Sequence, residues 1–180
     1  RNFIPIVLLI SVFLGCKNDK SVDALEVIKP EIVDTFFKVS VEFIANQDDD
    51  FSLFYTDDGS TNFLIPPIWK GVKGQSDIQR IDYYLPEEVF PSQLRLDFGL
   101  NKNQGDIILK NVILEYMGNK KEISGSELGL YFRPDTSKCS FDAASGVIKA
   151  VYVDGVRQYP SLYPFENVLG PEILKIAGIN

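Results

Sequence analysis

Apolar and polar residues alternate with a period of two through most of the chain after residue 35, and this pattern limits the fold most. Segments 38–43 and 94–98 show it plainly, with apolar residues at every second position and polar or charged residues between them. Successive side chains of a strand point to opposite faces, so each such segment predicts a strand with one buried face. Half-buried strands need an apolar partner layer, and no long helical period is present to supply one. We therefore expect an all-β fold.

Eight or nine such segments lie at spacings of roughly 8 to 14 residues. The expected strands are 38–43, 51–56, 69–72, 78–85, 94–98, 107–116, 121–123 and 147–153, with weaker candidates at 128–133 and 139–141. Two antiparallel sheets packed face to face accommodate this set. A jelly-roll-like β-sandwich is the first expectation and an immunoglobulin-like sandwich the alternative, because the pattern does not fix the strand order.

Local sequence signals predict a β-bulge, two tight turns and two short helical segments. The alternation changes parity near Lys110 and Asn111, which predicts a β-bulge within 107–116. Residues 117–120 and Asp154-Gly155 predict tight turns between antiparallel strands. Residues 85–90 could form one helical turn, and 171–178, with Pro early and Gly at the end, predicts a short C-terminal helix.

Charge and composition exclude several classes of function. The chain has 18 Lys and Arg against 25 Asp and Glu, a formal net charge of −7, so it lacks the basic surface that nucleic-acid binding needs. It has no histidine, which rules out a Ser-His-Asp triad, a Cys-His pair and any His-ligated metal site within the chain. We expect no cofactor and no nucleic-acid partner.

The first 16 residues have the pattern of a secretory signal. Residues 3–14 are apolar except for Ser11, with Arg1 before them and Gly15-Cys16 after them. Twelve helical residues reach about 18 Å, well short of the roughly 30 Å hydrocarbon core of a bilayer. A basic start, a short apolar run and small residues at its end predict a cleaved signal peptide. The alternatives are an uncleaved anchor and a buried first strand.

The end of this segment, Phe13-Leu14-Gly15-Cys16, resembles the lipobox of bacterial lipoproteins. The resemblance implies cleavage before Cys16 and acylation of Cys16, which would make the membrane a partner through a lipid anchor. Several acyl chains on one residue anchor a protein stably, whereas one chain alone is marginal. Lys17-Asn18-Asp19 partly resembles the export tag of surface lipoproteins in the Bacteroides–Flavobacterium group. The expected location is the bacterial cell envelope, on the outer membrane, with the periplasmic face and the cell surface both open.

These signals divide the chain into three parts. Residues 1–15 are the expected signal peptide, 16–35 the lipidated cysteine with a polar tether, and 36–180 the β-sandwich domain. If Cys16 is acylated, Cys139 is a lone thiol, for which a small buried core residue is the ordinary role. The strand-rich middle, with Arg95-Leu96-Asp97 followed by the long apolar run of 107–114, loosely resembles jelly-roll modules of bacterial envelope and glycan-processing proteins.

Acidic clusters offer weak candidates for a metal or a catalytic pair. Asp48 to Asp50 and the pair Asp57 and Asp58 flank one expected strand, and crowded oxygen ligands suit Ca²⁺. The strand should separate the two clusters, so solvated turn carboxylates are the better interpretation and Asp57 and Asp58 remain weak calcium candidates. Two carboxylates could hydrolyse a glycan without histidine, but no spacing singles out a pair. We assign no catalytic residue.

Aromatic residues give the more useful candidates for ligand binding. Residues 159–165 (YPSLYPF) place three aromatic rings and two prolines in what we expect to be a stiff loop. Aromatic rings with polar groups nearby can bind sugars by stacking on a C–H face. The candidate ligand-binding residues are Trp69, Tyr159 and Tyr163, and the alternative is a loop that packs as a lid over one end of the sandwich.

The function expected from the sequence is therefore an envelope-anchored lipoprotein with a non-catalytic β-sandwich binding module that binds a glycan. The first alternative is a structural or assembly module that contacts an envelope protein. The second is a small glycan hydrolase. A concave aromatic surface would favour the first function, whereas a flat apolar patch or an open sheet edge would favour assembly.

Overall fold

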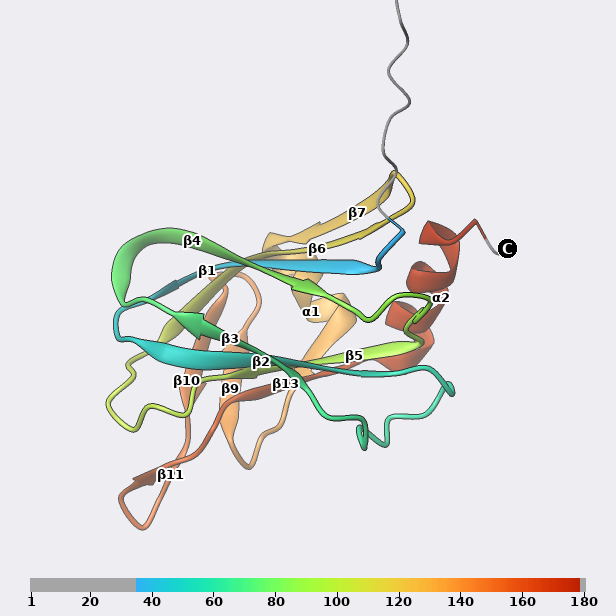
Figure 1. Cartoon of the computed structure of the whole chain (residues 1–180). Coiled ribbons are helices and arrows are strands. Elements are labelled where there is room, and N and C mark those ends of the chain that lie inside the picture. The colour runs from blue at the N-terminus through green and yellow to red at the C-terminus, as the bar shows by residue number, and fades with distance from the viewer. Residues whose placement is uncertain (1–34, 179–180) are drawn as a thin grey trace, which may run out of the picture. The chain divides into compact units, whose positions relative to one another are not determined.

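Two antiparallel sheets pack face to face over residues 35–178, the part of the chain that this computed structural model describes (Figure 1). These residues belong to one unit, Val33–Asn180. The expected all-β sandwich with a short C-terminal helix is confirmed. The predicted signal peptide, Cys16 and most of the tether lie outside the described residues. No helix within 35–178 is long and apolar enough to cross a membrane.

The first sheet, called sheet A, has six strands. Five of them follow the order β4-β1-β6-β10-β9, and the sixth, β7, also pairs with β6. The strands are β1 (Lys38–Ala45), β4 (Gln75–Tyr84), β6 (Ile107–Tyr116), β7 (Asn119–Ser124), β9 (Cys139–Asp142) and β10 (Val147–Ala150).

The second sheet, called sheet B, has five strands in the order β3-β2-β5-β13-β8. They are β2 (Asp49–Thr56), β3 (Ile68–Val72), β5 (Gln93–Phe98), β8 (Phe132–Pro134) and β13 (Ser161–Pro164). The remaining elements are the hairpin β11 (Tyr152–Val153) and β12 (Val156–Arg157), the 3₁₀ turn η1 (Gly125–Glu127), and the helices α1 (Leu128–Tyr131) and α2 (Glu166–Ile176).

The core lies between the two sheets and follows the alternation of the sequence. The apolar core residues of β1, β2 and β5 come from alternate positions, and together with residues of β6 and α2 they form one hydrophobic cluster. The ring of Phe51 on β2 lies 4.8 Å from that of Phe43 on β1 and 5.3 Å from that of Phe98 on β5. Such aromatic pairs add to the burial energy that joins the sheets.

The predicted bulge and turns are confirmed. In the β1–β6 pairing, Glu42 lies opposite Asn111 and Phe43 opposite Leu109, so Lys110 is the extra residue where the alternation changes parity. Met117 and Gly118 both have positive φ (47° and 81°), and so do Asp154 and Gly155 (50° and 77°). Positive φ at both central residues matches the twist of the flanking antiparallel strands, which is why these dipeptides form the turns.

Several local expectations were wrong. Residues 85–90 form a turn in which the Val89 N–H donates to the Pro86 carbonyl, 3.1 Å away, and no helix. The expected strand 128–133 is α1 followed by β8, because Leu128 and Tyr131 bury one side of a helical turn. Helix α2 begins at Glu166 and contains Pro171 inside it. Burial of Leu169, Ile173 and Ile176 offsets the hydrogen bond that Pro171 cannot make.

Figure 1 shows how the strands of the two sheets are arranged. In this view β1, β4 and β7 of sheet A lie above β2 and β5 of sheet B. The β11–β12 hairpin projects at the lower left, at the end of the sandwich opposite to α2.

Candidate functional site

The outer face of sheet B carries a cluster of aromatic and charged side chains. Leu53, Leu96 and Leu162 face the core, so their neighbours in the strands face outward. One row across the strands runs Trp69–Ser52–Asp97–Ser161. The next row contains Phe54 opposite Arg95, and Tyr163 opposite Arg133. We call the cluster the aromatic platform; it consists of Phe54, Phe63, Trp69, Arg95, Asp97 and Tyr163.

Arg95 is the centre of the aromatic platform. Its guanidinium carbon lies 3.7 Å from the ring centroid of Phe54, 5.4 Å from that of Phe63 and 5.1 Å from that of Tyr163. Guanidinium groups at such distances are attracted by the negative face of an aromatic ring. Phe63 comes from the β2–β3 loop, and its ring meets those of Phe54 and Tyr163 edge-on. The loop therefore packs onto this face of the sheet.

Asp97 fixes the orientation of Arg95. The Nε and Nη2 atoms of Arg95 donate to Oδ1 and Oδ2 of Asp97 at 2.9 and 2.7 Å, and Nη1 donates to the Tyr163 hydroxyl at 3.2 Å. The side chains of Arg95 and Asp97 are only 14% and 19% exposed. A two-pronged pair of this kind fixes the guanidinium plane as well as its position. The contacts of Arg95 thus fix the rings of Tyr163 and Phe54 next to each other on the outer face of sheet B.

The structure brings two of the three predicted ligand-binding residues to this face. Trp69 lies on the edge strand β3 with 47% of its surface exposed, and Tyr163 lies half-buried on β13. Three strand spacings separate them, about 14 Å, with an offset of about 7 Å along the strands. Tyr159, also exposed, precedes β13 and lies four residues from Tyr163 along the chain. A ligand contacting both Trp69 and Tyr163 would need to be an extended one.

The expected loop 159–165 is largely strand β13, which corrects that part of the prediction. Leu162 pairs with Leu96 on β5 and with Pro134 on β8, so the segment fills the sheet between two strands. Proline at 160 and 164 is tolerated because each stands at or beyond the end of the short strand. Tyr163 is consequently part of the packed sheet, whereas Trp69 is the freer ring.

A hollow adjoins the aromatic platform at β8. It has a volume of about 490 Å³ and is lined by Arg133, Pro134, Asp135, Thr136 and Tyr163. The guanidinium carbon of Arg133 lies 5.6 Å from the Tyr163 ring centroid. The ring of Tyr163 therefore lies between two guanidinium groups, those of Arg95 and Arg133.

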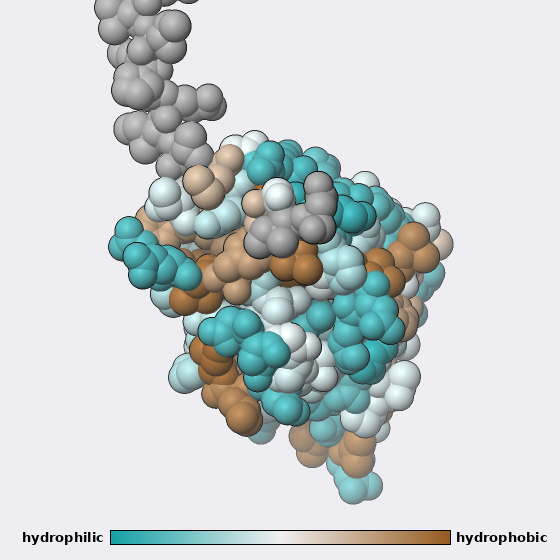
Figure 2. All heavy atoms as spheres, turned by 90° about the vertical axis from the view of Figure 1, so that its right-hand side faces the viewer, coloured by the Kyte–Doolittle hydropathy of each residue, from teal (hydrophilic) through white to brown (hydrophobic). Residues whose placement is uncertain are grey.

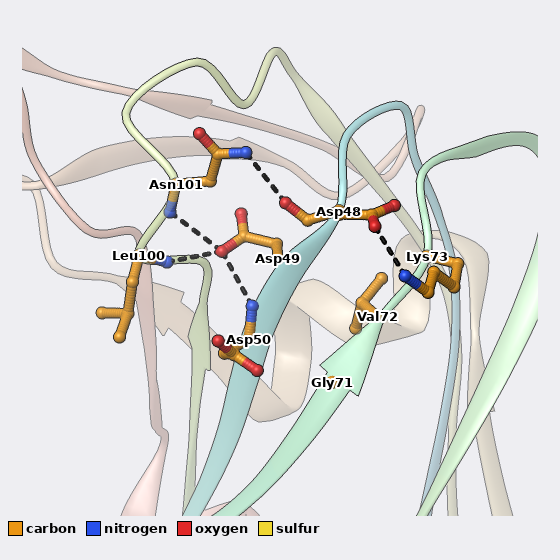
Figure 3. A pocket seen from close by; sticks show the side chains of 8 residues that line it. All are labelled: Asp48, Asp49, Asp50, Gly71, Val72, Lys73, Leu100 and Asn101. Atoms are coloured by element: carbon orange, nitrogen blue, oxygen red, sulfur yellow. Dashed lines mark hydrogen bonds and ion pairs between the residues drawn. The ribbon is translucent and has the colours of Figure 1, made fainter.

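A second hollow, of about 610 Å³, lies where β1 turns into β2 and is lined by Asp48, Asp49 and Asp50 among others (Figure 3). Oδ1 of Asp49 accepts the backbone N–H groups of Asp50, Leu100 and Asn101 at 2.9, 2.7 and 2.9 Å. Oδ2 of Asp49 accepts from Gln104 at 3.1 Å. This buried carboxylate clamps the loop after β5 onto the start of β2, and its oxygens are occupied by the protein's own donors.

The acidic clusters lie at opposite ends of β2, as the strand between them required. Asp48 is bound by Lys73 (2.7 Å) and by the Gly74 N–H (2.8 Å), and the latter is the main reason that its pKa is lowered. Asp58 closes its own turn by accepting the Ser60 N–H at 2.9 Å, and Asp57 lines a separate groove. Within residues 35–178 no group of three or more His, Cys, Asp or Glu residues is placed to hold a metal ion.

That groove lies between the β4–β5 connection and α2, on the side of the molecule that Figure 2 presents. Its volume is about 420 Å³, and Phe90, Pro91 and Leu174 give it apolar walls, with Asp57 and Glu166 among its polar lining. Figure 2 shows apolar residues in separate patches divided by polar ones on this side. This side therefore presents no continuous apolar face.

Two further side chains of chemical interest are buried. Cys139 is a free thiol that donates to the Ser161 carbonyl at 3.4 Å, and burial raises its pKa. This agrees with a small core residue. Arg157, at the base of the β11–β12 hairpin, is buried, and within residues 35–178 its guanidinium nitrogens have no hydrogen-bond partner. Burial lowers the pKa of Arg157, although the Asp49 carboxylate acts in the opposite direction.

No protein-family model matches the chain, and neither a curated protein nor a solved structure gave a significant match. The chemistry of the aromatic platform and its surroundings is thus the basis for assigning a function.

Proposed function

We propose that the chain is an envelope lipoprotein whose β-sandwich is a non-catalytic binding module, and that this module binds a glycan on the aromatic platform. The observation that carries the proposal is the placement of the half-exposed Trp69 on the same sheet face as the fixed cluster of Arg95, Asp97 and Tyr163. An indole ring offers a flat apolar surface to a sugar's C–H face. The neighbouring side chains add hydrogen-bonding groups.

The rigidity of the aromatic platform supports this role. Arg95 is held by Asp97 and by three rings, so the surface is formed before a ligand arrives. A preorganised site loses little conformational entropy on binding, which matters for weak stacking contacts.

A second candidate function, assembly with an envelope protein, rests on the β11–β12 hairpin. Tyr152, Val153 and Val156 are all exposed on this projecting element. Exposed apolar side chains gathered on one projection are typical of contact sites for another protein.

Glycan-array binding by the purified chain tests the main proposal. We expect binding to one class of oligosaccharide, and a comparison with Trp69→Ala on the same array should show weaker signals. Protein that is folded but binds no glycan would contradict the proposal.

The anchor is tested separately. Cys16→Ala should leave the protein unacylated, which a mass measurement detects, and should release it from membranes. Unchanged membrane retention together with an unchanged mass would contradict the lipoprotein assignment.

A further inference from the structure

The hollow at β8 holds an arginine whose charge is not compensated nearby. Arg133 is exposed, and within residues 35–178 no carboxylate lies within 4.0 Å of its guanidinium. The guanidinium carbon of Arg133 lies 5.6 Å from the centroid of the Tyr163 ring. Arg95, on the other side of the same ring, is neutralised by Asp97 at 2.7 Å. The two guanidinium groups that flank Tyr163 therefore differ: one is part of the scaffold, and the other is free to bind a ligand.

The carboxylate in the same hollow is engaged elsewhere. Asp135 Oδ1 accepts the Ser137 N–H at 3.1 Å and the Ser137 hydroxyl at 2.6 Å, while Oδ2 lies 3.6 Å from Lys138 Nζ. The hydrogen bond from the Ser137 hydroxyl is the main cause of the lowered pKa of Asp135. Asp135 and Lys138 offset each other, so the charge of Arg133 remains.

We infer that the glycan bound on the aromatic platform is an acidic one, and that Arg133 recognises its carboxylate in the hollow beside Tyr163. This inference rests on the proposed function. A guanidinium matches a carboxylate with two parallel N–H···O hydrogen bonds, a geometry that an ammonium group does not offer. Tyr163 and Pro134 supply apolar contact for the sugar ring that bears the carboxylate.

The net charge of the whole chain limits where an acidic ligand can bind. A net charge of −7 repels acidic ligands at long range, so an acidic glycan binds only where a positive group is close. Salt screens such a contact over about 8 Å at physiological ionic strength. Because salt screens the long-range repulsion as well as the contact with Arg133, the probes are compared at one fixed salt concentration.

The test compares a carboxylate with an alcohol on the same sugar backbone. The probes are oligogalacturonate and oligomannuronate, each beside a counterpart of equal length whose carboxyl groups are reduced to primary alcohols. The purified full chain is titrated with each probe by calorimetry. The variants are Arg133→Gln, Arg133→Lys and, as a control with the same change in net charge at an exposed site, Lys102→Gln.

We expect the wild-type chain to bind at least one acidic probe about ten-fold more tightly than its reduced counterpart. Arg133→Gln should abolish that preference while leaving the affinity for the reduced probe unchanged, Arg133→Lys should restore it only in part, and Lys102→Gln should keep it. Equal binding of acidic and reduced probes by the wild-type chain would overturn the inference and leave the proposed function standing. Binding of none of the probes would overturn the inference, and the glycan array would then decide the proposed function independently.

Discussion

Arg95 and Asp97, two residues apart on β5, are joined by two hydrogen bonds of 2.9 and 2.7 Å on the outer face of sheet B. Both side chains are mostly buried, and the Arg95 guanidinium lies against the Phe54, Phe63 and Tyr163 rings, so water screens the pair little. The pair has a counterpart on the other sheet: Arg80 and Asp82 have the same spacing on β4 and a 2.9 Å contact, but both are more than one-third exposed. Arg80 also lies 3.8 Å from Glu42 and 3.7 Å from Glu115, so the two pairs differ both in exposure and in the carboxylates that remain when the aspartate is replaced.

Asp97→Asn should lower the free energy of unfolding by about 2 kcal/mol, because it removes a charged hydrogen-bond partner and leaves a shielded guanidinium behind. Asp82→Asn should cost less than about 1 kcal/mol, as exposed ion pairs do. Urea unfolding of both variants measures the difference. Equal losses would contradict the account in which Asp97 is the shielded carboxylate partner of Arg95.

Tyr163→Ala should lower the free energy of unfolding by about 2 kcal/mol, since the ring is half-buried against Phe63 and between two guanidinium groups. The loss reflects the position of Tyr163 within β13, where a stiff loop was expected. Tyr163→Phe, which loses only the hydrogen bond from Arg95, should cost about 1 kcal/mol or less. The exposed Tyr159 should tolerate alanine with little loss. Thermal and urea unfolding of the three variants would contradict this account if Tyr159→Ala proved the most damaging.

The alternation of the sequence predicted the strands and the bulge because each depends on neighbouring residues only. The change of parity at Lys110 shows directly as a register shift against β1. Arg95 and Asp97 were evident as outward residues of one strand for the same reason. The contacts of Arg95 with Phe54 and Tyr163 were not predictable, because they depend on which strands flank β5. That order is set by the packing of distant segments, about which a period of two says nothing.

The errors have a similar origin. Residues 128–131 are apolar enough for a strand, but tertiary packing of Leu128 and Tyr131 selects a helical turn. The two prolines of 159–165 suggested a loop, whereas pairing with β5 and β8 makes its middle a strand. In both cases burial against distant residues outweighs the local preference.

Gly99→Ala should be much more damaging than Gly59→Ala, although the two glycines have similar positive φ values of 84° and 80°. A Cβ at Gly59 would meet nothing, so only the backbone strain of about 1 kcal/mol remains. A Cβ at Gly99 would collide with the Asp49 carboxylate and disturb the clamp on Leu100 and Asn101. This should add about 2 kcal/mol, as overpacking does. Similar free energies of unfolding for both variants would argue against the clamp.

Arg157→Met should raise the free energy of unfolding by about 1 kcal/mol or more. The buried guanidinium has no hydrogen-bond partner within residues 35–178, and a side chain of similar length and apolar character avoids the cost of burying a charge. Urea unfolding measures the change. A marked loss of stability would contradict this account, because it would mean that the Arg157 guanidinium stabilises the fold.

The central claim, a glycan site on the aromatic platform, is tested most directly by titrating the purified chain and two alanine variants with an oligosaccharide identified on the array. Trp69 on β3 and Tyr84 on β4 are exposed to 47% and 46%, and both are aromatic residues of edge strands, but Tyr84 belongs to sheet A. Trp69→Ala should weaken binding about five-fold, the equivalent of roughly 1 kcal/mol for one stacked ring, while Tyr84→Ala should leave the affinity unchanged. Wild-type affinity in Trp69→Ala, with both variants fully folded, would contradict the claim.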